Sequence, residues 1–249
     1  MLQEERFLKI LNMLTKKHSV TVHEVMQQLQ VSEATTRRDL TLLNEQGKLI
    51  KVHGGAIAVG SEVSTLDADV SERVLLHQEE KKNIACYAAA LIEPGDYVYL
   101  DAGTTVGFMI EYITQKEAVY VTNAIGHARA LSKSGCSVYL LGGKIKPLTE
   151  AVVGGETVEQ LQRYHFTKGF FGTNGIHPKY GYTTPDAEEA KVKEIALKHC
   201  RKAYILSDAS KFNQIASVGF APVSAATVLT DSVPELSYKQ ATKILEVPT

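Results

Sequence analysis

Residues 31–40 read Val-Ser-Glu-Ala-Thr-Thr-Arg-Arg-Asp-Leu and form the most informative stretch of the chain. Ser32 is a favourable N-cap residue and Gly47 is typical of the position just after a helix, so the spacing predicts a helix over about 32–46. At about 100° per residue, Thr36, Leu40 and Leu43 share one face, which we expect to pack against a core. The opposite face and its flanks carry Ala34, Thr35, Arg37, Arg38, Thr41 and Glu45.

Two shorter helical patterns precede this segment and a hairpin pattern follows it. Apolar residues recur at steps of three and four from Leu2 to Leu14, and Thr21 stands three residues before Glu24, as in a capping box. Lys48 to Val52 is predicted to be a strand, and His53-Gly54-Gly55 a tight turn into Ala56-Ile57. We therefore expect a compact domain over 1–57, followed by a linker over 58–74.

The outward residues of the predicted third helix suit the major groove of DNA. Hydroxyl and methyl groups there are small enough to enter the groove, and guanidinium groups pair with phosphate or guanine. The basic hairpin suits a wing that lies along the DNA backbone. Adjacent arginines alone are also common on a solvated helix face, so the spacing and the hairpin carry this prediction. The residues expected to contact DNA are Ser32, Ala34, Thr35, Arg37, Arg38, Thr41, Lys48, Lys51, His53 and Gly54.

The charge of the chain is unevenly distributed. The total is 27 Lys+Arg against 28 Asp+Glu, a net charge of −1, which by itself disfavours nucleic acid as a partner. Residues 1–57 carry 8 Lys+Arg and 6 Asp+Glu (+2), and the remaining 19 and 22 give −3. The total thus hides a mildly basic first part and an acidic second part.

The composition predicts a soluble cytoplasmic protein. Apolar residues make up 44% and charged residues 22%, no apolar run approaches the ~20 residues of a membrane-spanning helix, and the first thirty residues do not resemble a signal peptide. Cys86, Cys136 and Cys200 are odd in number and far apart, so we expect no disulfide framework and a reducing compartment. The eight histidines are dispersed, and we expect neither a metal nor a cofactor.

From about Lys81 onward, predicted strands and helices alternate. Such alternation is typical of a mainly parallel sheet covered on both faces, so we expect an α/β domain over 75–249. The expected strands are 97–100, 118–122, 137–141, 169–172, 203–206 and 227–229. The expected helices are 84–92, 105–113, 124–132, 156–164, 186–199 and 238–245.

Polar and glycine-rich segments follow several of these strands, at the edge of a parallel sheet where ligands bind. Asp101-Ala102-Gly103-Thr104-Thr105 joins a strand to a helix, and free amides at a helix start suit a phosphate. We expect this segment to converge with others, although each alone is also ordinary turn chemistry. The further candidates are Thr122, Asn123, Gly142, Gly143, Asn174 and Lys211, with Glu188 at the start of the helix predicted over 186–199.

The first domain resembles the DNA-binding domain of the DeoR family of bacterial repressors. The resemblance rests on the segment from Val31 to Leu40, on Leu43 and Gly47, and on His53-Gly54-Gly55-Ala56. It implies a winged helix–turn–helix whose recognition helix begins near Ser32. Asp39 is expected to be a buried partner of an arginine or a backbone donor, and not a base contact.

The second domain is similar to the family's effector domain, which resembles ribose-5-phosphate isomerase in fold. The elements Asp-x-Gly-Thr-Thr, Thr-Asn, Gly-Gly, Gly-x-Asn-Gly and Asp-x-Ser-Lys stand in the family's order within residues 75–231. The resemblance implies sugar-phosphate binding without turnover. By it, Gly103, Thr104 and Thr105 hold phosphate, Lys211 adds positive charge, and the sugar hydroxyls are bound by Asp101, Asn123 and Asn174.

The fold class expected is thus an N-terminal winged helix–turn–helix plus a C-terminal α/β sensor domain. Residues 146–154 and the chain as a whole look similar to repressors of fructose operons, so the expected effector is a sugar phosphate such as fructose 1-phosphate. The expected partners are double-stranded operator DNA, that effector and a second copy in a homodimer or homotetramer, with no membrane.

Two other functions fit the sequence less well. One is a sugar-phosphate isomerase with an appended DNA-binding domain, for which Asp101 and Glu188 are base candidates by residue type only. The other is a transcriptional activator with the same two domains. Among the remaining features, the alternating charges Glu188, Glu189, Lys191, Lys193 and Glu194 predict a solvated helix face, and Tyr180 and Tyr182 predict turn packing.

Overall fold

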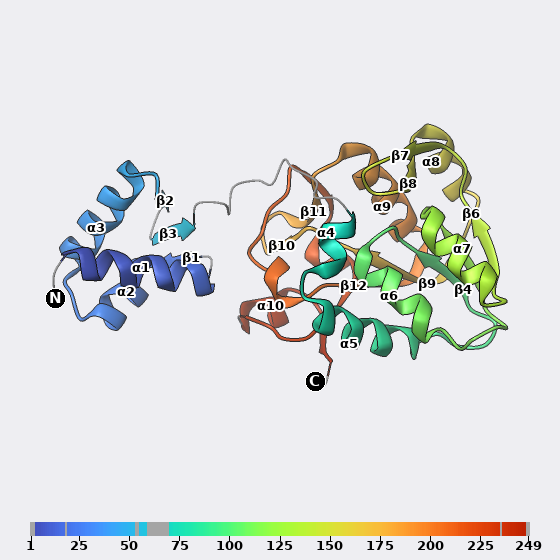
Figure 1. The fold of residues 1–249 in the computed structure, drawn as a ribbon, viewed down its shortest axis with the longest axis horizontal. Helices are drawn as coiled ribbons and strands as arrows, with labels where there is room; N and C mark the ends of the chain where they lie inside the picture. Colours follow the sequence, from blue (N-terminus) through green and yellow to red (C-terminus); the bar gives the residue numbers. More distant parts are fainter. Residues whose placement is uncertain (1–2, 18, 53–54, 59–69, 235, 248–249) are drawn as a thin grey trace. The chain divides into compact units, whose positions relative to one another are not determined.

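The computed structural model describes residues 3–17, 19–52, 55–58, 70–234 and 236–247 (Figure 1). It divides into two compact units, Met1–Ser64 and Thr65–Thr249, each with a hydrophobic core of its own. Within the described residues, no helix is long and apolar enough to cross a membrane.

The first unit is a small helical domain with a short antiparallel sheet. Its helices are α1 (Gln3–Lys17), α2 (Val22–Leu29) and α3 (Glu33–Glu45), and its strands are β1 (Ser19–Thr21), β2 (Leu49–Val52) and β3 (Gly55–Ala58). The strand β3 pairs with both β1 and β2. The prediction of a two-stranded hairpin was therefore incomplete, because three residues of β1 are too few to show a periodic pattern. The core consists of Ile10, Leu14, Val20, Val22, Val25, Leu29, Leu40, Leu43, Leu49 and Ala56.

Local signals in the sequence set the ends of these helices. The predicted capping box at α2 is present, since Thr21 Oγ1 accepts from the Glu24 amide at 3.1 Å and the Glu24 carboxylate accepts from the Thr21 amide at 2.8 Å. Gly47 has a φ of +65°, a left-handed conformation in which glycine is not strained, and the chain turns there from α3 into β2.

The second unit is built on a seven-stranded parallel sheet in the order β15-β14-β12-β9-β4-β5-β6. Adjacent residues along a strand point to opposite faces, so Val98 and Leu100 pack in one core cluster and Tyr99 in the other. The fold class predicted from the strand–helix alternation is confirmed. The strands are β4 (Tyr97–Leu100), β5 (Val119–Thr122), β6 (Ser137–Leu140), β9 (Phe166–Gly172), β12 (Cys200–Leu206), β14 (Thr227–Thr230) and β15 (Ile244–Glu246).

Helices cover both faces of this sheet. The core cluster on one face takes residues from α5 (Gln78–Ala89), α6 (Thr104–Tyr112) and α7 (Ile125–Lys133). The cluster on the other face takes residues from α8 (Gly155–Leu161), α9 (Ala187–Lys198) and α10 (Leu236–Ala241). Figure 1 shows α5 and α6 side by side, and these two helices pack closely.

The structure corrects the sequence-based expectations in three places. The helix expected over 238–245 ends at Ala241, and Ile244–Glu246 instead extends the sheet as β15 beside β14. Residues 70–74, expected within the linker, belong to the helix α4 (Val70–Leu75). Short strands were also not predicted, again because each is only three or four residues long: β7 (Lys144–Lys146), β8 (Ala151–Val153), β10 (Gly175–His177), β11 (Gly181–Thr184) and β13 (Val218–Ala221).

Candidate functional site

The helix α3 presents the face that the sequence predicted. Thr36, Leu40 and Leu43 are buried, whereas Ala34, Arg37 and Arg38 are exposed. The N-cap Ser32 fixes the first turn, since its hydroxyl accepts from the Thr35 amide at 3.2 Å and lies 2.9 Å from the Thr35 hydroxyl. The first turn thus offers a methyl group, hydroxyl groups and guanidinium groups on one solvent-facing surface.

The two arginines differ in their surroundings. Arg37 forms an ion pair with Glu33 one turn earlier, with 2.7 Å between Nη2 and the carboxylate. Arg38 is exposed, and no carboxylate among the described residues pairs with it. The guanidinium of Arg38 is therefore available to an anion without breaking an existing pair.

The strand β2 is tied to α3 by side-chain contacts. Lys51 Nζ donates to Thr41 Oγ1 at 2.7 Å, and the Lys51 amide donates to Asn44 Oδ1 at 2.8 Å. Lys48 is exposed at the start of the hairpin, whereas His53 and Gly54, also expected to contact DNA, lie outside the described residues. The lysines of the hairpin and the outward face of α3 therefore form one connected polar surface.

Asp39 is buried, as predicted. Its partner is Arg6 of α1: Nε lies 2.6 Å from Oδ2 and Nη2 lies 3.0 Å from Oδ1, a two-point pair. The Asp39 hydrogen bond raises the pKa of Arg6, against the opposing effect of burial. This pair fixes α3 to α1 and removes Asp39 from the surface that α3 presents.

The second unit contains a polar cavity at the carboxyl edge of its parallel sheet. Four segments that follow four different strands meet there, as the sequence analysis predicted for this edge. Of the residues predicted from the sequence, the cavity brings together Asp101, Gly103, Thr104, Thr105, Asn123, Asn174 and Lys211.

The start of α6 and several cations line the cavity. The helix α6 begins at Thr104, and its N-cap Gly103 places no side chain over the first amides. The loops approach each other closely here, since a Cβ on Gly103 would lie 3.1 Å from the Gly172 Cα. Besides Lys193, which pairs with Asp101, three cationic side chains line the cavity: Arg73, Lys81 and Lys211.

Lys81 is the most unusual of these cations, because it is buried with 4% of its surface exposed. Its Nζ donates a hydrogen bond to the Arg73 carbonyl oxygen. Burial lowers the pKa of Lys81; Asp208 opposes that shift, while Lys211 and Arg73 add to it. The charges of Arg73, Lys81, Lys211 and Asp208 therefore lie close enough together to interact.

Buried carboxylates line the cavity as well, among them Asp101 and Glu189. Asp101 Oδ2 accepts from the Gly172 amide at 3.0 Å and forms an ion pair with Lys193, whose Nζ also donates to the Gly172 carbonyl at 3.2 Å. Glu189 Oε1 accepts from Thr149 Oγ1 at 2.6 Å and from Lys146 Nζ at 3.2 Å. These bonds hold both carboxylates in place from several elements.

The two asparagines that line the cavity are also held in place. Asn123 Oδ1 accepts from the Tyr99 hydroxyl at 3.0 Å, and its Nδ2 donates to the Val152 carbonyl at 3.1 Å. Asn174 Oδ1 accepts from Thr184 Oγ1 at 3.1 Å. The cavity wall is thus preorganised and rich in oxygen acceptors.

The expectation of a fully solvated face on α9 was wrong. Glu189 and Lys193 stand four residues apart on this helix, are buried and line the cavity. Glu188 and Lys191 are exposed; Glu188 pairs with Lys144 at 2.9 Å and does not line the cavity. The four-residue spacing of Glu189 and Lys193 indicates that they share one face of α9. Because both residues are charged, this face was predicted to be exposed.

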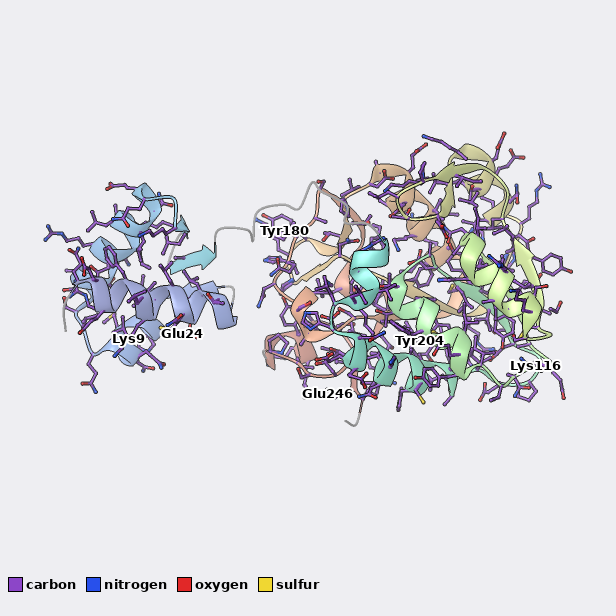
Figure 2. All side chains as sticks on the ribbon, in the orientation of Figure 1. Lys9, Glu24, Lys116, Tyr180, Tyr204 and Glu246 are labelled. Atoms are coloured by element: carbon purple, nitrogen blue, oxygen red, sulfur yellow. The ribbon has the colours of Figure 1, made fainter. Side chains whose placement is uncertain are left out.

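Other residues expected at the site lie elsewhere or serve the fold. Thr122 donates to the Leu100 carbonyl at 2.6 Å and so ties β5 to β4. Gly142 and Gly143 lie outside the cavity; a Cβ on Gly143 would lie 2.3 Å from Thr157 Oγ1, and its φ is +146°. Two tyrosines were expected to pack in a turn and not to line the site. Tyr182 is buried and donates to the Val223 carbonyl at 2.8 Å, whereas Tyr180, labelled in Figure 2, is half-exposed.

Sequence reasoning missed several residues of the cavity. Arg73 fell within the expected linker, and Lys81 stands in the run Glu79-Glu80-Lys81-Lys82, which looks like an exposed helix face. Within the described residues, no three His, Cys, Asp or Glu side chains are grouped so as to hold a metal ion.

Comparison with known proteins places both units in the same family. Residues 6–62 match the model of a DeoR-like helix-turn-helix domain, and residues 76–232 match that of the DeoR C terminal sensor domain. The second match covers more than half of the chain.

Relatives match over nearly their whole length. The chain is 41% identical to an uncharacterized HTH-type transcriptional regulator, FruR, of Bacillus subtilis (96% of this chain, 94% of the relative). It is 35% identical to the HTH-type transcriptional repressor GlcR of the same organism (96% and 92%) and 33% identical to the lactose phosphotransferase system repressor of Streptococcus mutans (99% of each chain).

Solved structures show a more distant likeness. Ribose 5-phosphate isomerase A from Neisseria gonorrhoeae aligns with a TM-score of 0.41 and 15% identity, over 56% of this chain and 54% of that chain.

Proposed function

The chain belongs to the DeoR family, and from this premise we propose that it represses a sugar-utilisation operon and releases its operator when a phosphorylated sugar binds the second unit. The observation that carries the proposal is a cavity whose wall combines the start of α6 and cationic side chains with buried carboxylates and asparagines. The operon is a fructose operon in this proposal, and the effector is fructose 1-phosphate.

The start of α6 and the nearby cations of the cavity wall suit a phosphate group. Free amides at the start of α6 and the helix dipole favour an anion there, and the hydroxyls of Thr104 and Thr105 add donors. Arg73, Lys81 and Lys211 supply the compensating charge. A phosphate dianion would replace repulsion among these cations with charge-assisted hydrogen bonds.

The carboxylates and asparagines of the cavity wall suit the hydroxyl groups of a sugar. Carboxylate and amide oxygens accept hydrogen bonds from hydroxyls, and Asp101, Glu189 and Asn123 are already oriented by other bonds, so that little ordering is needed on binding. A ligand that carries both a phosphate and several hydroxyls therefore matches the cations and amides as well as the oxygen acceptors of this wall.

The preference for fructose 1-phosphate has narrower support. It rests on the similarity of residues 146–154 to fructose-operon repressors, and this segment supplies Thr149, which lines the cavity and donates to Glu189. Relatives named after a lactose phosphotransferase system support a phosphorylated sugar as the class of effector.

Binding without turnover is part of the proposal. Isomerisation needs a general base free to take a proton from the sugar. Asp101 is paired with Lys193, and Glu189 is bonded to Thr149 and Lys146. Both carboxylates thus have partners that fix them as hydrogen-bond acceptors.

For DNA, the proposal places α3 in the major groove and Lys48 and Lys51 along the backbone of double-stranded operator DNA. A homodimer or homotetramer would match a symmetric operator.

A thermal-shift panel tests the effector. The full chain is heated with fructose 1-phosphate, fructose 6-phosphate, glucose 6-phosphate, ribose 5-phosphate and unphosphorylated fructose, and each phosphate is also assayed for turnover. We expect the largest shift with fructose 1-phosphate, none with fructose and no product. A larger shift with another sugar phosphate changes the effector, and turnover of any of them contradicts the proposal of a regulator.

Operator binding is then measured with a duplex selected by the protein from a random library. Affinity should fall steeply with salt, because cations of the first unit displace counterions from the DNA. Fructose 1-phosphate should weaken binding by the wild type. It should have no effect on the double variant Thr104→Ala, Lys211→Ala, and release of DNA from this variant at the wild-type concentration would show that the cavity is not the effector site.

A further inference from the structure

A short stretch of chain, residues 70–81, supplies two of the four cations that line the cavity, the others being Lys193 and Lys211. Arg73 lies in α4 and Lys81 in the first turns of α5. The two are joined directly, because Lys81 Nζ donates to the Arg73 carbonyl oxygen. Arg73 therefore makes α4 part of the cavity wall.

The helix α4 is short. It is six residues long and packs on α6, with Val74 partly buried against the core. Its last residue, Leu75, and the following Leu76 are 74% and 54% exposed. A helix of this length is only marginally stable by itself, so contacts with a ligand should matter for its order.

The charges give a ligand a specific effect on this segment. Burial lowers the pKa of Lys81; Asp208 opposes that shift, and Lys211 and Arg73 add to it, so these charges lie within interaction range of one another. An anion bound beside Lys81, Arg73 and Lys211 is attracted by all three. Binding therefore stabilises the arrangement that joins α4 to α5, which is the differential interaction that a conformational response requires.

The position of α4 in the chain relates ligand binding in the cavity to the DNA-binding unit. It is the first helix of the second unit, and the chain reaches it directly from the segment that follows the DNA-binding unit. A change in the order of α4 thus acts on the connection between the unit that binds DNA and the unit that binds the ligand.

We propose that Arg73 and Lys81 bind the anionic group of the effector, and that α4 is the element through which an occupied cavity alters operator binding. This inference rests on the proposed function, since it assumes that a phosphorylated sugar occupies the cavity. It gives Arg73 and Lys81 a direct bond to the anionic group and assigns α4 a regulatory role.

Hydrogen exchange of the full chain, with and without saturating fructose 1-phosphate, tests the role of α4. We expect slower exchange in residues 104–107 of α6, which bind the phosphate, and in residues 70–76. Protection in α6 without protection in 70–76 overturns this inference and leaves the proposed function intact. No protection in either segment, with this or any other sugar phosphate of the panel, contradicts the proposed function and this inference together.

Variants test the two side chains. Arg73→Gln and Lys81→Met should each weaken fructose 1-phosphate binding at least about tenfold, as expected for loss of a charge-assisted hydrogen bond. At saturating ligand, Arg73→Gln should keep protection in 104–107, lose it in 70–76 and retain the operator. The controls are Arg129→Gln on the exposed surface of α7 and Lys82→Met next to Lys81. Wild-type affinity and operator release in both Arg73→Gln and Lys81→Met would overturn the inference.

Discussion

The pair of Asp101 and Lys193 shows how a single contact serves both fold and site. The two residues are 92 positions apart in sequence, both are buried, and Lys193 also bonds the Gly172 carbonyl next to the cavity. A buried charge that loses its partner is costly to the folded state, more so than the pair is favourable.

We therefore predict that Lys193→Met lowers the free energy of unfolding of the second unit by about 3 kcal/mol, because Asp101 is left buried without its cation. The same variant should lose most of its affinity for fructose 1-phosphate. Urea unfolding monitored by tyrosine fluorescence and isothermal titration measure the two effects. Lys191→Met, an exposed residue of the same helix, is the control, and equal stability of the two variants would contradict the prediction.

A second buried pair lies at the start of β4. Asp96 accepts from Lys168 Nζ, the Glu93 amide and Thr167 Oγ1, each at 2.7 Å. Burial by itself raises the pKa of Asp96, but hydrogen bonds from Lys168, from Thr167 and from the Glu93 amide outweigh it, so the pKa lies below the ordinary value. Because the folded-state pKa is lowered, the stabilisation is present above the pKa of the unfolded chain and is lost as the pH falls through the folded-state pKa.

Asp96→Asn should therefore be less stable than wild type at pH 7 by about 2 kcal/mol, since Lys168 keeps only Glu93 as a charged partner. The difference should shrink as the pH falls below the unfolded-chain pKa of about 4, because the unfolded carboxylate then takes up a proton before the folded one does. Urea midpoints at pH 7, 5, 4 and 3 measure this. A difference that stays constant down to pH 3 would show that the charge of Asp96 does not stabilise the fold.

Sequence reasoning at the scale of residues succeeded where periodicity was clear. The helix phase predicted that Thr36, Leu40 and Leu43 are buried, and all three are. Lys193 was assigned to the surface because lysine is rarely buried without a partner, and its partner comes from a distant strand end. Only the assembled sheet edge brings Asp101 and Gly172 to it.

At the scale of elements, the sequence predicts long apolar strands well and short edge elements poorly. The strand β4 has the predicted bounds, since four consecutive apolar residues are followed by a turn and helix start. The hairpin of β7 and β8 has three residues in each strand and was not predicted, yet the loop between them supplies Thr149 to the cavity. The helix α4 was missed for the same reason, and Arg73 with it.

The helix α3 carries the clearest prediction at this scale. Arg38→Ala should reduce affinity for the selected operator at least about tenfold and, if Arg38 contacts phosphate, lower the salt dependence by about one charge. Fructose 1-phosphate should still raise the melting temperature of this variant fully, because the cavity belongs to the other unit. Lys9→Ala, exposed on α1, removes one charge from the same unit and is the control. Loss of both operator binding and the thermal shift would contradict the division into two domains.

At the scale of the whole molecule, the near-neutral total charge is the sum of unlike parts. A count of +2 over residues 1–57 is modest, so the placement of Arg38, Lys48 and Lys51 carries the argument for DNA binding and the total does not. The acidic remainder nevertheless places four cations, Arg73, Lys81, Lys193 and Lys211, in the wall of its cavity. Such local concentration cannot be read from composition, because it depends on which strand ends meet.

Two separate cores predict two separate responses to ligands. The first unit packs around Ile10, Leu40 and Leu43, and the second around the two faces of its own sheet. A ligand stabilises the unit that binds it, by about 2.7 kcal/mol at one hundred times its dissociation constant. Calorimetry of the full chain should therefore show two transitions, of which fructose 1-phosphate raises only the one belonging to the second unit, and operator DNA raises the other. Hydrogen exchange in α3 and β4 assigns each transition to its unit, and a single transition shifted equally by both ligands would show that the two units unfold as one.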